Sequence, residues 1–177
     1  MNDGTLFRDY LASIGILPGI KVDKGAKDLS CHPDEKITEG LDGLRDRLAA
    51  YYENGAKFCK WRAVITIANN IPSDACIESN MNALARYASL CQENNLVPIV
   101  EPEVLINGTH SIDDCDKVTR KSLSSLFSHL KMFNVYLPGT VLKPSMVISG
   151  QENDSRASYE EVASKTIACL KDFVPND

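Results

Sequence analysis

Two glutamates, Glu101 and Glu103, end an apolar run in the stretch VPIVEPEV at residues 97–104. Side chains two apart on an extended chain point to the same face, so a strand here would aim both carboxylates into one space. Carboxylates near a protein interior are costly unless cations pair with them or a reaction uses them. Pro102 lies between the two acids. Because proline cannot donate to a strand ladder, we expect the strand to end there.

Ionisable side chains recur at the ends of other apolar runs, at intervals of about 40 residues. If the runs are parallel strands, their carboxyl ends meet at one edge of the sheet, and in a (β/α)8 barrel these ends form a ring. The spacing therefore predicts a shared site in which acids meet cations. The alternative is that each group is an ordinary solvated cap of its own strand. The residues concerned are Lys21, Asp23, Lys60, Arg62, Glu101, Glu103 and Lys143.

Strand-like and helix-like patterns alternate along the chain. Apolar, β-branched runs predict strands at 16–22, 58–67, 96–100 and 135–142. Apolar repeats of three and four residues predict helices over 41–52 and over 77–91. Two more helices are expected to begin at Ser111 and Ser158, because an acid follows each serine three residues on. This order predicts parallel βαβ units in an α/β fold.

Composition excludes several classes of function. The chain has 177 residues, of which 44% are hydrophobic and 24% charged, and its net charge is −5. This balance predicts a soluble globular unit and disfavours nucleic acid and anionic membranes as partners. We see neither a transmembrane span nor a signal peptide, and the six cysteines form no CxxC pair, so we expect a cytoplasmic protein with reduced thiols. The three histidines lack metal-ligand spacing, and no metal is expected.

Six motifs resemble those of class I fructose-bisphosphate aldolases, and the resemblance runs from about Phe7 to the C-terminal end. Three residues or segments depart from the family pattern: Ser145 stands where asparagine is usual, Pro138 where an acid is usual, and Ala26–Lys36 is unlike its counterpart. The motifs are GIKVDKG at 19–25, GLDGL at 40–44, KWR at 60–62, LARYAS at 84–89, VPIVEPE at 97–103 and GTVLKPSMV at 139–147.

The resemblance implies a (β/α)8 TIM barrel of which the chain holds about four βα units, corresponding to barrel strands three to six. We expect a single incomplete barrel domain over 1–177, with a lead-in helix at 1–14 and the βα units over 15–177. Since a whole barrel takes roughly 250 residues, strands one, two, seven and eight are expected to be missing. Open sheet edges then predict self-association as a homo-oligomer.

The resemblance also implies a role for each ionisable residue. Lys143 is similar to the Schiff-base lysine that attacks the ketose carbonyl, and Glu101 to the acid–base group that assists dehydration of the carbinolamine. Lys60 and Glu103 resemble partners of these two groups. The remaining residues are assigned to binding of the phosphorylated sugar: Lys21, Arg62 and Asp23. No cofactor is expected, because the protonated imine serves as the electron sink.

Physical chemistry supports these roles independently. A free lysine has a pKa of about 10.4, so keeping it neutral at pH 7 costs about 4.6 kcal/mol unless the site helps. A second cation such as Lys60 and the loss of water both favour the neutral amine. Forming the imine also requires proton transfer by a carboxyl group within hydrogen-bond reach, a role that fits Glu101.

Two functions therefore compete. The first is a lyase that cleaves fructose 1,6-bisphosphate to dihydroxyacetone phosphate and glyceraldehyde 3-phosphate in glycolysis. The second is a catalytically incomplete remnant that binds sugar phosphates or associates with aldolase subunits. Covalent capture of a ketose phosphate at Lys143 would separate them.

Overall fold

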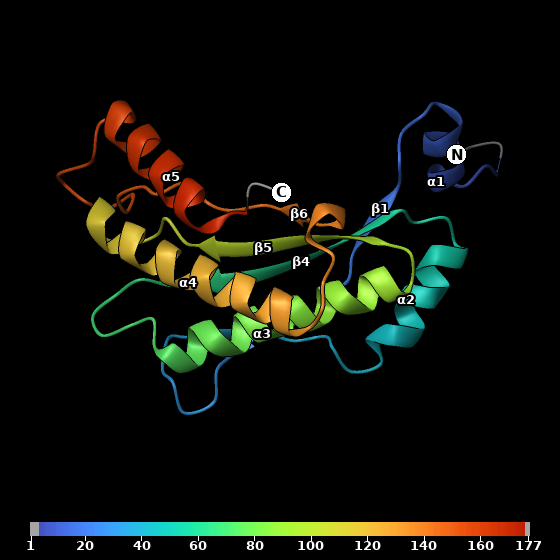
Figure 1. Cartoon of the computed structure of the whole chain (residues 1–177), viewed down its shortest axis with the longest axis horizontal. Helices are drawn as coiled ribbons and strands as arrows, with labels where there is room; N and C mark the ends of the chain where they lie inside the picture. The colour runs from blue at the N-terminus through green and yellow to red at the C-terminus, as the bar shows by residue number, and fades with distance from the viewer. Residues whose placement is uncertain (1–3, 176–177) are drawn as a thin grey trace.

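Four parallel strands form one sheet in the order β1-β4-β5-β6 in the computed structural model of the chain, which describes residues 4–175 (Figure 1). The central strands β4 and β5 pair along eight residues each, whereas β1 and β6 add short edges. The strands are β1 (Gly19–Lys21), β4 (Phe58–Ile65), β5 (Val97–Val104) and β6 (Val141–Leu142). An antiparallel hairpin of β2 (Ala26–Asp28) and β3 (Lys36–Thr38) follows β1.

Helices separate the strands, as βαβ connections require. The long helices begin at serine caps: Ser73 accepts from Cys76 N–H, Ser111 from Asp114 N–H, and Ser158 from Glu161 N–H. Residues 1–3 of the expected lead-in segment and 176–177 lie outside the described residues. The helices are α1 (Phe7–Ser13), α2 (Leu44–Glu53), α3 (Asp74–Glu93), α4 (Ile112–Met132) and α5 (Tyr159–Phe173), with a 3₁₀ turn at Leu137–Gly139.

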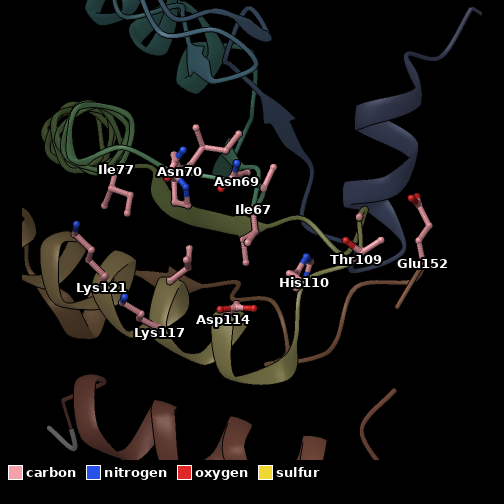
Figure 2. Close-up of a pocket in the computed structure, with 15 residues that line it drawn as sticks. Ile67, Asn69, Asn70, Ile77, Thr109, His110, Asp114, Lys117, Lys121 and Glu152 are labelled. Atoms are coloured by element: carbon pink, nitrogen blue, oxygen red, sulfur yellow. The ribbon is translucent and has the colours of Figure 1, made fainter. Parts of the chain in front are cut away.

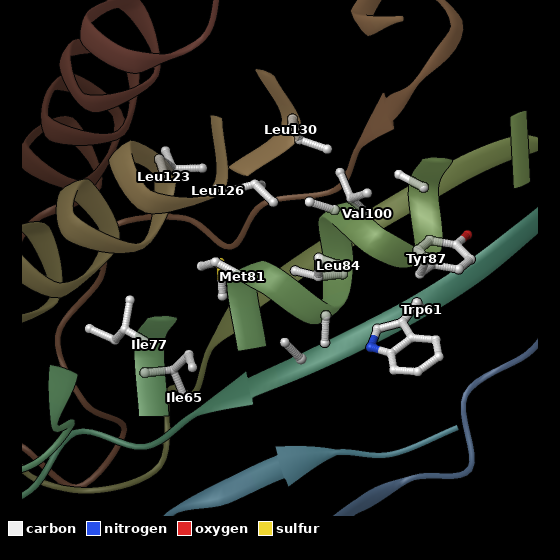
Figure 3. Packing of buried hydrophobic residues seen from close by; sticks show 14 of the residues in the cluster. Trp61, Ile65, Ile77, Met81, Leu84, Tyr87, Val100, Leu123, Leu126 and Leu130 are labelled. Atoms are coloured by element: carbon white, nitrogen blue, oxygen red, sulfur yellow. The ribbon is translucent and has the colours of Figure 1, made fainter. Parts of the chain in front are cut away.

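The core lies between the sheet and the helices α3 and α4, which pack side by side on one face of it (Figure 1). The alternation of side chains between the two faces of each strand explains this position of the core. Odd-numbered residues of β4 and even-numbered residues of β5 are buried toward these helices, and the intervening residues face the other way. Trp61 and Tyr87 pack with ring centroids 5.5 Å apart. Figure 3 shows this cluster, which includes Ile65, Ile77, Met81, Leu84, Val100, Leu123, Leu126 and Leu130.

The strand β5 is longer than we predicted, because Pro102 does not end it. Val97 N–H donates to the carbonyl of Lys57, just before β4, and Leu105 N–H donates to the carbonyl of Ile65. The backbone N–H groups of the odd-numbered residues of β5 therefore point toward β4, and the nitrogen of Pro102 points toward the β6 side. There β6 pairs only as far as Val100 and Leu142. The missing N–H of Pro102 therefore removes no ladder bond, and the strand continues to Val104.

Both edge strands are shorter than we predicted. The first strand begins only at Gly19, because Pro18 has no N–H to donate to a neighbouring strand. The carbonyl of Pro18 accepts from Lys57 N–H at 2.8 Å. In the predicted strand over 135–142, the Gln92 side chain bonds both the N–H and the carbonyl of Tyr136 and holds the chain in a turn. Only Val141–Leu142 remain extended. The hairpin of β2 and β3 was not predicted at all.

Candidate functional site

The candidate site lies on the face of the sheet that α3 and α4 do not cover. The even-numbered residues of β4, the odd-numbered residues of β5 and the end of β6 all point to this side, which we call the inner face. In the register of the strands, Lys21 of β1 lies opposite Lys60 of β4, and Arg62 of β4 lies opposite Glu101 of β5. Ionisable side chains from four strands therefore lie close together on the inner face.

Glu101 is the centre of this arrangement. The Glu101 side chain is only 4% exposed, and its carboxylate lies between two ammonium groups. Lys143 Nζ donates to Glu101 Oε1 at 2.5 Å, and Lys60 Nζ lies 2.7 Å from Oε2. The side chains of Lys60 and Lys143 are 32% and 59% exposed. The structure thus brings together three of the residues that the sequence predicted to share a site.

Two opposing effects act on the charge of Glu101. Burial alone raises the pKa of a carboxyl group, because it disfavours the charged form. The hydrogen bonds and positive charges of Lys143 and Lys60 outweigh burial, and the pKa of Glu101 is lowered. Glu101 is therefore a carboxylate at neutral pH, able to accept a proton from a group bound at Lys143.

The other predicted residues form two further ion pairs on the same face. Arg62 of β4 pairs with Glu103 of β5 through its guanidinium. Lys21 pairs with Asp23, whose side chain is only 1% exposed and also accepts from the N–H groups of Gly25 and Arg62. Asp23 thus fixes the end of β1 against β4, which positions Lys21 beside the site.

This arrangement has the parts needed for addition of an amine to a carbonyl. Lys143 offers an accessible amine, and Glu101 lies within hydrogen-bond reach to move protons. Lys21, Lys60 and Arg62 provide positive charge for an anionic substrate. Among residues 4–175, no group of three or more histidine, cysteine or acidic side chains has the arrangement of a metal site.

Comparison with known proteins identifies relatives over the whole chain. The sequence model of the family described as Fructose-bisphosphate aldolase class-I matches residues 1–177. A probable fructose-bisphosphate aldolase class 1 from Xanthomonas axonopodis pv. citri is 58% identical over 98% of this chain and 52% of its own length. A cytosolic fructose-bisphosphate aldolase 4 from Arabidopsis thaliana is 49% identical over 97% of this chain and 44% of its own. The chain spans about half the length of the curated relatives it matches.

A solved structure shows the same fold. The fructose-bisphosphate aldolase from Plasmodium falciparum, crystallised with TRAP and a small-molecule inhibitor, superposes with a TM-score of 0.94 at 45% identity. The match covers 98% of this chain and 50% of the other. The four parallel strands and their helices are accordingly part of a (β/α)8 barrel. In the described part of the chain, no helix is both long and apolar enough to span a bilayer.

Proposed function

Because the chain belongs to the class I fructose-bisphosphate aldolase family, we propose that it carries the imine chemistry of that family on a phosphorylated ketose. The overall reaction is cleavage of fructose 1,6-bisphosphate to dihydroxyacetone phosphate and glyceraldehyde 3-phosphate, a step of glycolysis. One observation carries the proposal: the amine of Lys143 lies 2.5 Å from a carboxylate oxygen of the buried Glu101.

In the proposed mechanism Lys143 is the nucleophile and Glu101 moves the protons. The neutral amine of Lys143 adds to the ketose carbonyl and forms a carbinolamine. Glu101 returns a proton to the carbinolamine oxygen, which leaves as water, and the protonated imine remains. When the carbon–carbon bond breaks, its electron pair moves toward the imine nitrogen and gives an enamine, while the proton of the adjacent hydroxyl passes to the Glu101 carboxylate and the other fragment leaves as an aldehyde. Protonation of the enamine and hydrolysis then release the three-carbon ketose phosphate and regenerate the amine.

The remaining inner-face residues have supporting roles in this proposal. Lys60 holds the second oxygen of Glu101 and adds a positive charge near Lys143. Arg62 and Lys21 bind phosphate oxygens, while Glu103 and Asp23 orient these two cations. The chemistry requires no cofactor or metal. We place the protein in the cytoplasm, by analogy with the cytosolic relative from Arabidopsis.

Borohydride reduction tests the proposal directly. Incubation with dihydroxyacetone phosphate followed by reduction should add one stable adduct, which peptide mass spectrometry locates at Lys143. Lys143→Arg should abolish the adduct, whereas Lys171→Arg, an exposed lysine of α5, should leave its yield unchanged. Glu101→Gln should slow adduct formation by at least tenfold, since it removes the proton carrier.

The second candidate function is non-covalent binding of sugar phosphates. The exposure of the Lys143 side chain favours it, because an open site does not exclude water from the reacting groups. In that case dihydroxyacetone phosphate would bind without any adduct, and Arg62→Ala would weaken the binding. Absence of an adduct in the wild-type chain would refute imine chemistry. An adduct without cleavage of fructose 1,6-bisphosphate would support imine formation and refute cleavage by this chain.

A further inference from the structure

A cavity of 720 Å³ lies beyond the carboxyl ends of β4 and β5, beside α3 and α4 (Figure 2). Ile77 of α3 and Val118 of α4 line it, as do the loops that follow β4 and β5. None of the ion-paired residues of the inner face lines this cavity. Its volume falls in the range of about 300–1,000 Å³ that is typical of small-molecule sites.

The walls of the cavity differ in chemistry. Part of the lining is apolar and comes from Ile67, Ile71, Ile77 and Val118. Asn69 and Asn70 lie beside it in the loop between β4 and α3, where their amides offer both donors and acceptors (Figure 2). Across the cavity, Lys117 and Lys121 project from α4 four residues apart, on one face of the helix (Figure 2).

His110 is the buried polar group that this cavity leaves without a partner. It is 8% exposed, and neither of its ring nitrogens forms a hydrogen bond within the described chain. The Ile148 carbonyl lies close enough to influence the ring but lacks hydrogen-bond geometry. Burial lowers the pKa of His110 more than Asp114 and this carbonyl raise it, so the ring is neutral at pH 7. A neutral imidazole has one donor and one acceptor, and in native structures buried groups of this kind are normally satisfied.

The charges that line the cavity limit the charge of its ligand. Lys121 already pairs with Asp74, an exposed partner that a ligand can replace at little cost. Asp114 and Glu152 also line the cavity, although the Asp114 carboxylate already accepts hydrogen bonds from the N–H and the hydroxyl of Ser111. Two lysines set against two acids favour a ligand with one anionic group over a polyphosphate.

We propose that this cavity binds a nucleoside monophosphate. The base packs on the isoleucine side chains of the lining, and its polar edge meets the amides of Asn69 and Asn70. The phosphate lies between Lys117 and Lys121, and His110 gains the hydrogen-bond partner that it lacks in the free protein. The site is independent of the ketose chemistry on the inner face.

Adenosine monophosphate is the probe for the test, and the histidine rings are the reporters. The chain has three histidines, so labelling histidine with ¹³C at Cε1 gives three ring signals. His32→Gln and His129→Gln assign the His110 signal by elimination, without altering the cavity. Titration with adenosine monophosphate should shift the His110 signal saturably and leave the other two in place. Adenosine lacks the phosphate and ribose 5-phosphate lacks the base, so each should bind at least tenfold more weakly than adenosine monophosphate.

Substitution of the two lysines locates the phosphate. Lys117→Ala with Lys121→Ala should weaken binding of adenosine monophosphate at least tenfold, and both positions are exposed, so the variant should fold. The matched control is Lys131→Ala with Lys171→Ala, which should bind as the wild-type chain does. The proposal fails if His110 shows no saturable shift, or if the lysine variant binds normally. It fails equally if ribose 5-phosphate binds as tightly as the nucleotide.

Discussion

At the scale of single residues, the charge of Glu101 depends on two lysines that reach it from neighbouring strands. Burial and ion pairing oppose one another, and pairing prevails, so the pKa of Glu101 lies below its usual 4.5. A carboxyl group with a lowered pKa in the folded state stabilises the fold at pH values above its unfolded pKa. That contribution is lost as the pH falls through the folded value.

The stability that Glu101 contributes should therefore depend on pH. We expect Glu101→Gln to unfold at lower urea concentration than the wild-type chain at pH 7, because the variant cannot pair with Lys60 and Lys143. The difference should shrink as the pH falls below 4.5 and through the lowered pKa of Glu101, where the wild-type carboxylate takes up a proton. Urea unfolding followed by circular dichroism across this range measures it. The exposed Glu53→Gln is the control, and a difference that stayed constant with pH would contradict the linkage.

The side chains of the site were easier to predict than their surroundings. Ionisable residues at the carboxyl ends of neighbouring parallel strands meet at one edge of the sheet, so the strand-end positions of Lys60, Glu101 and Lys143 predicted that they lie together. The roles of these residues remain predictions until an adduct is found. His110 gave no comparable signal, because its burial depends on packing between the loops after β4 and β5. Its sequence position offered only a test for metal-ligand spacing, which it did not meet.

At the scale of elements, local signals predicted the helices well. The capping box at the start of α4 is an example: Ser111 accepts from Asp114 N–H, and the Asp114 carboxylate accepts in return from Ser111 N–H. Ser111→Ala should lower the free energy of unfolding by about 1 kcal/mol, which lowers the melting temperature by roughly 2–4 °C for a chain of this size. Differential scanning calorimetry tests this. Ser124→Ala, at an exposed position of the same helix, should have no such effect.

The hairpin of β2 and β3 illustrates what local signals missed. Its segment is polar and short, and it is held by Asn80 of α3, more than forty residues away in the chain. The buried Asn80 side chain accepts from Thr38 N–H at 3.2 Å and donates to the Lys36 carbonyl at 2.8 Å. No sequence pattern within the hairpin predicts a contact with so distant a residue. In the same way, nothing in the sequence near Tyr136 predicts its hydrogen bonds with Gln92.

Asn80→Ala should therefore loosen the hairpin. The substitution leaves the Thr38 N–H and the Lys36 carbonyl without their partner, at a cost of about 1–3 kcal/mol. Amide hydrogen exchange should accelerate in β3 more than in β5, because β5 keeps its pairing with β4. Asn82→Ala, two residues along the same helix, provides the comparison. Equal exchange in the two variants would show that Asn80 does not anchor the hairpin.

At the scale of the whole molecule, the sheet is open on one face and at both edges. The exposed apolar side chains Val97 and Val141 lie on the inner face, at 41% and 47% exposure. The strands β1 and β6 each pair on one side only within the described residues. Unpaired parallel edges are templates for further strands, and a closed barrel removes them.

We therefore predict that the chain self-associates through these edges. In a two-fold arrangement about the barrel axis, β1 of each copy would pair with β6 of the other, and two four-stranded sheets would complete one eight-stranded ring. Pairing would also bury the inner face and reduce the access of water to Lys143. Size-exclusion chromatography with light scattering should then give twice the monomer mass of 19.5 kDa.

A charge placed on the edge separates this arrangement from non-specific association. Val141→Lys sets an ammonium on the inner face of β6, where pairing would bury it, and should shift the chain toward monomer, because lysine on an edge strand discourages pairing. Ile167→Lys changes an equally exposed apolar residue of α5, far from the edge in sequence, and should leave the mass unchanged. If the wild-type chain is a monomer at all concentrations, the edges do not pair. If both variants dissociate equally, the contact lies elsewhere than at the strands.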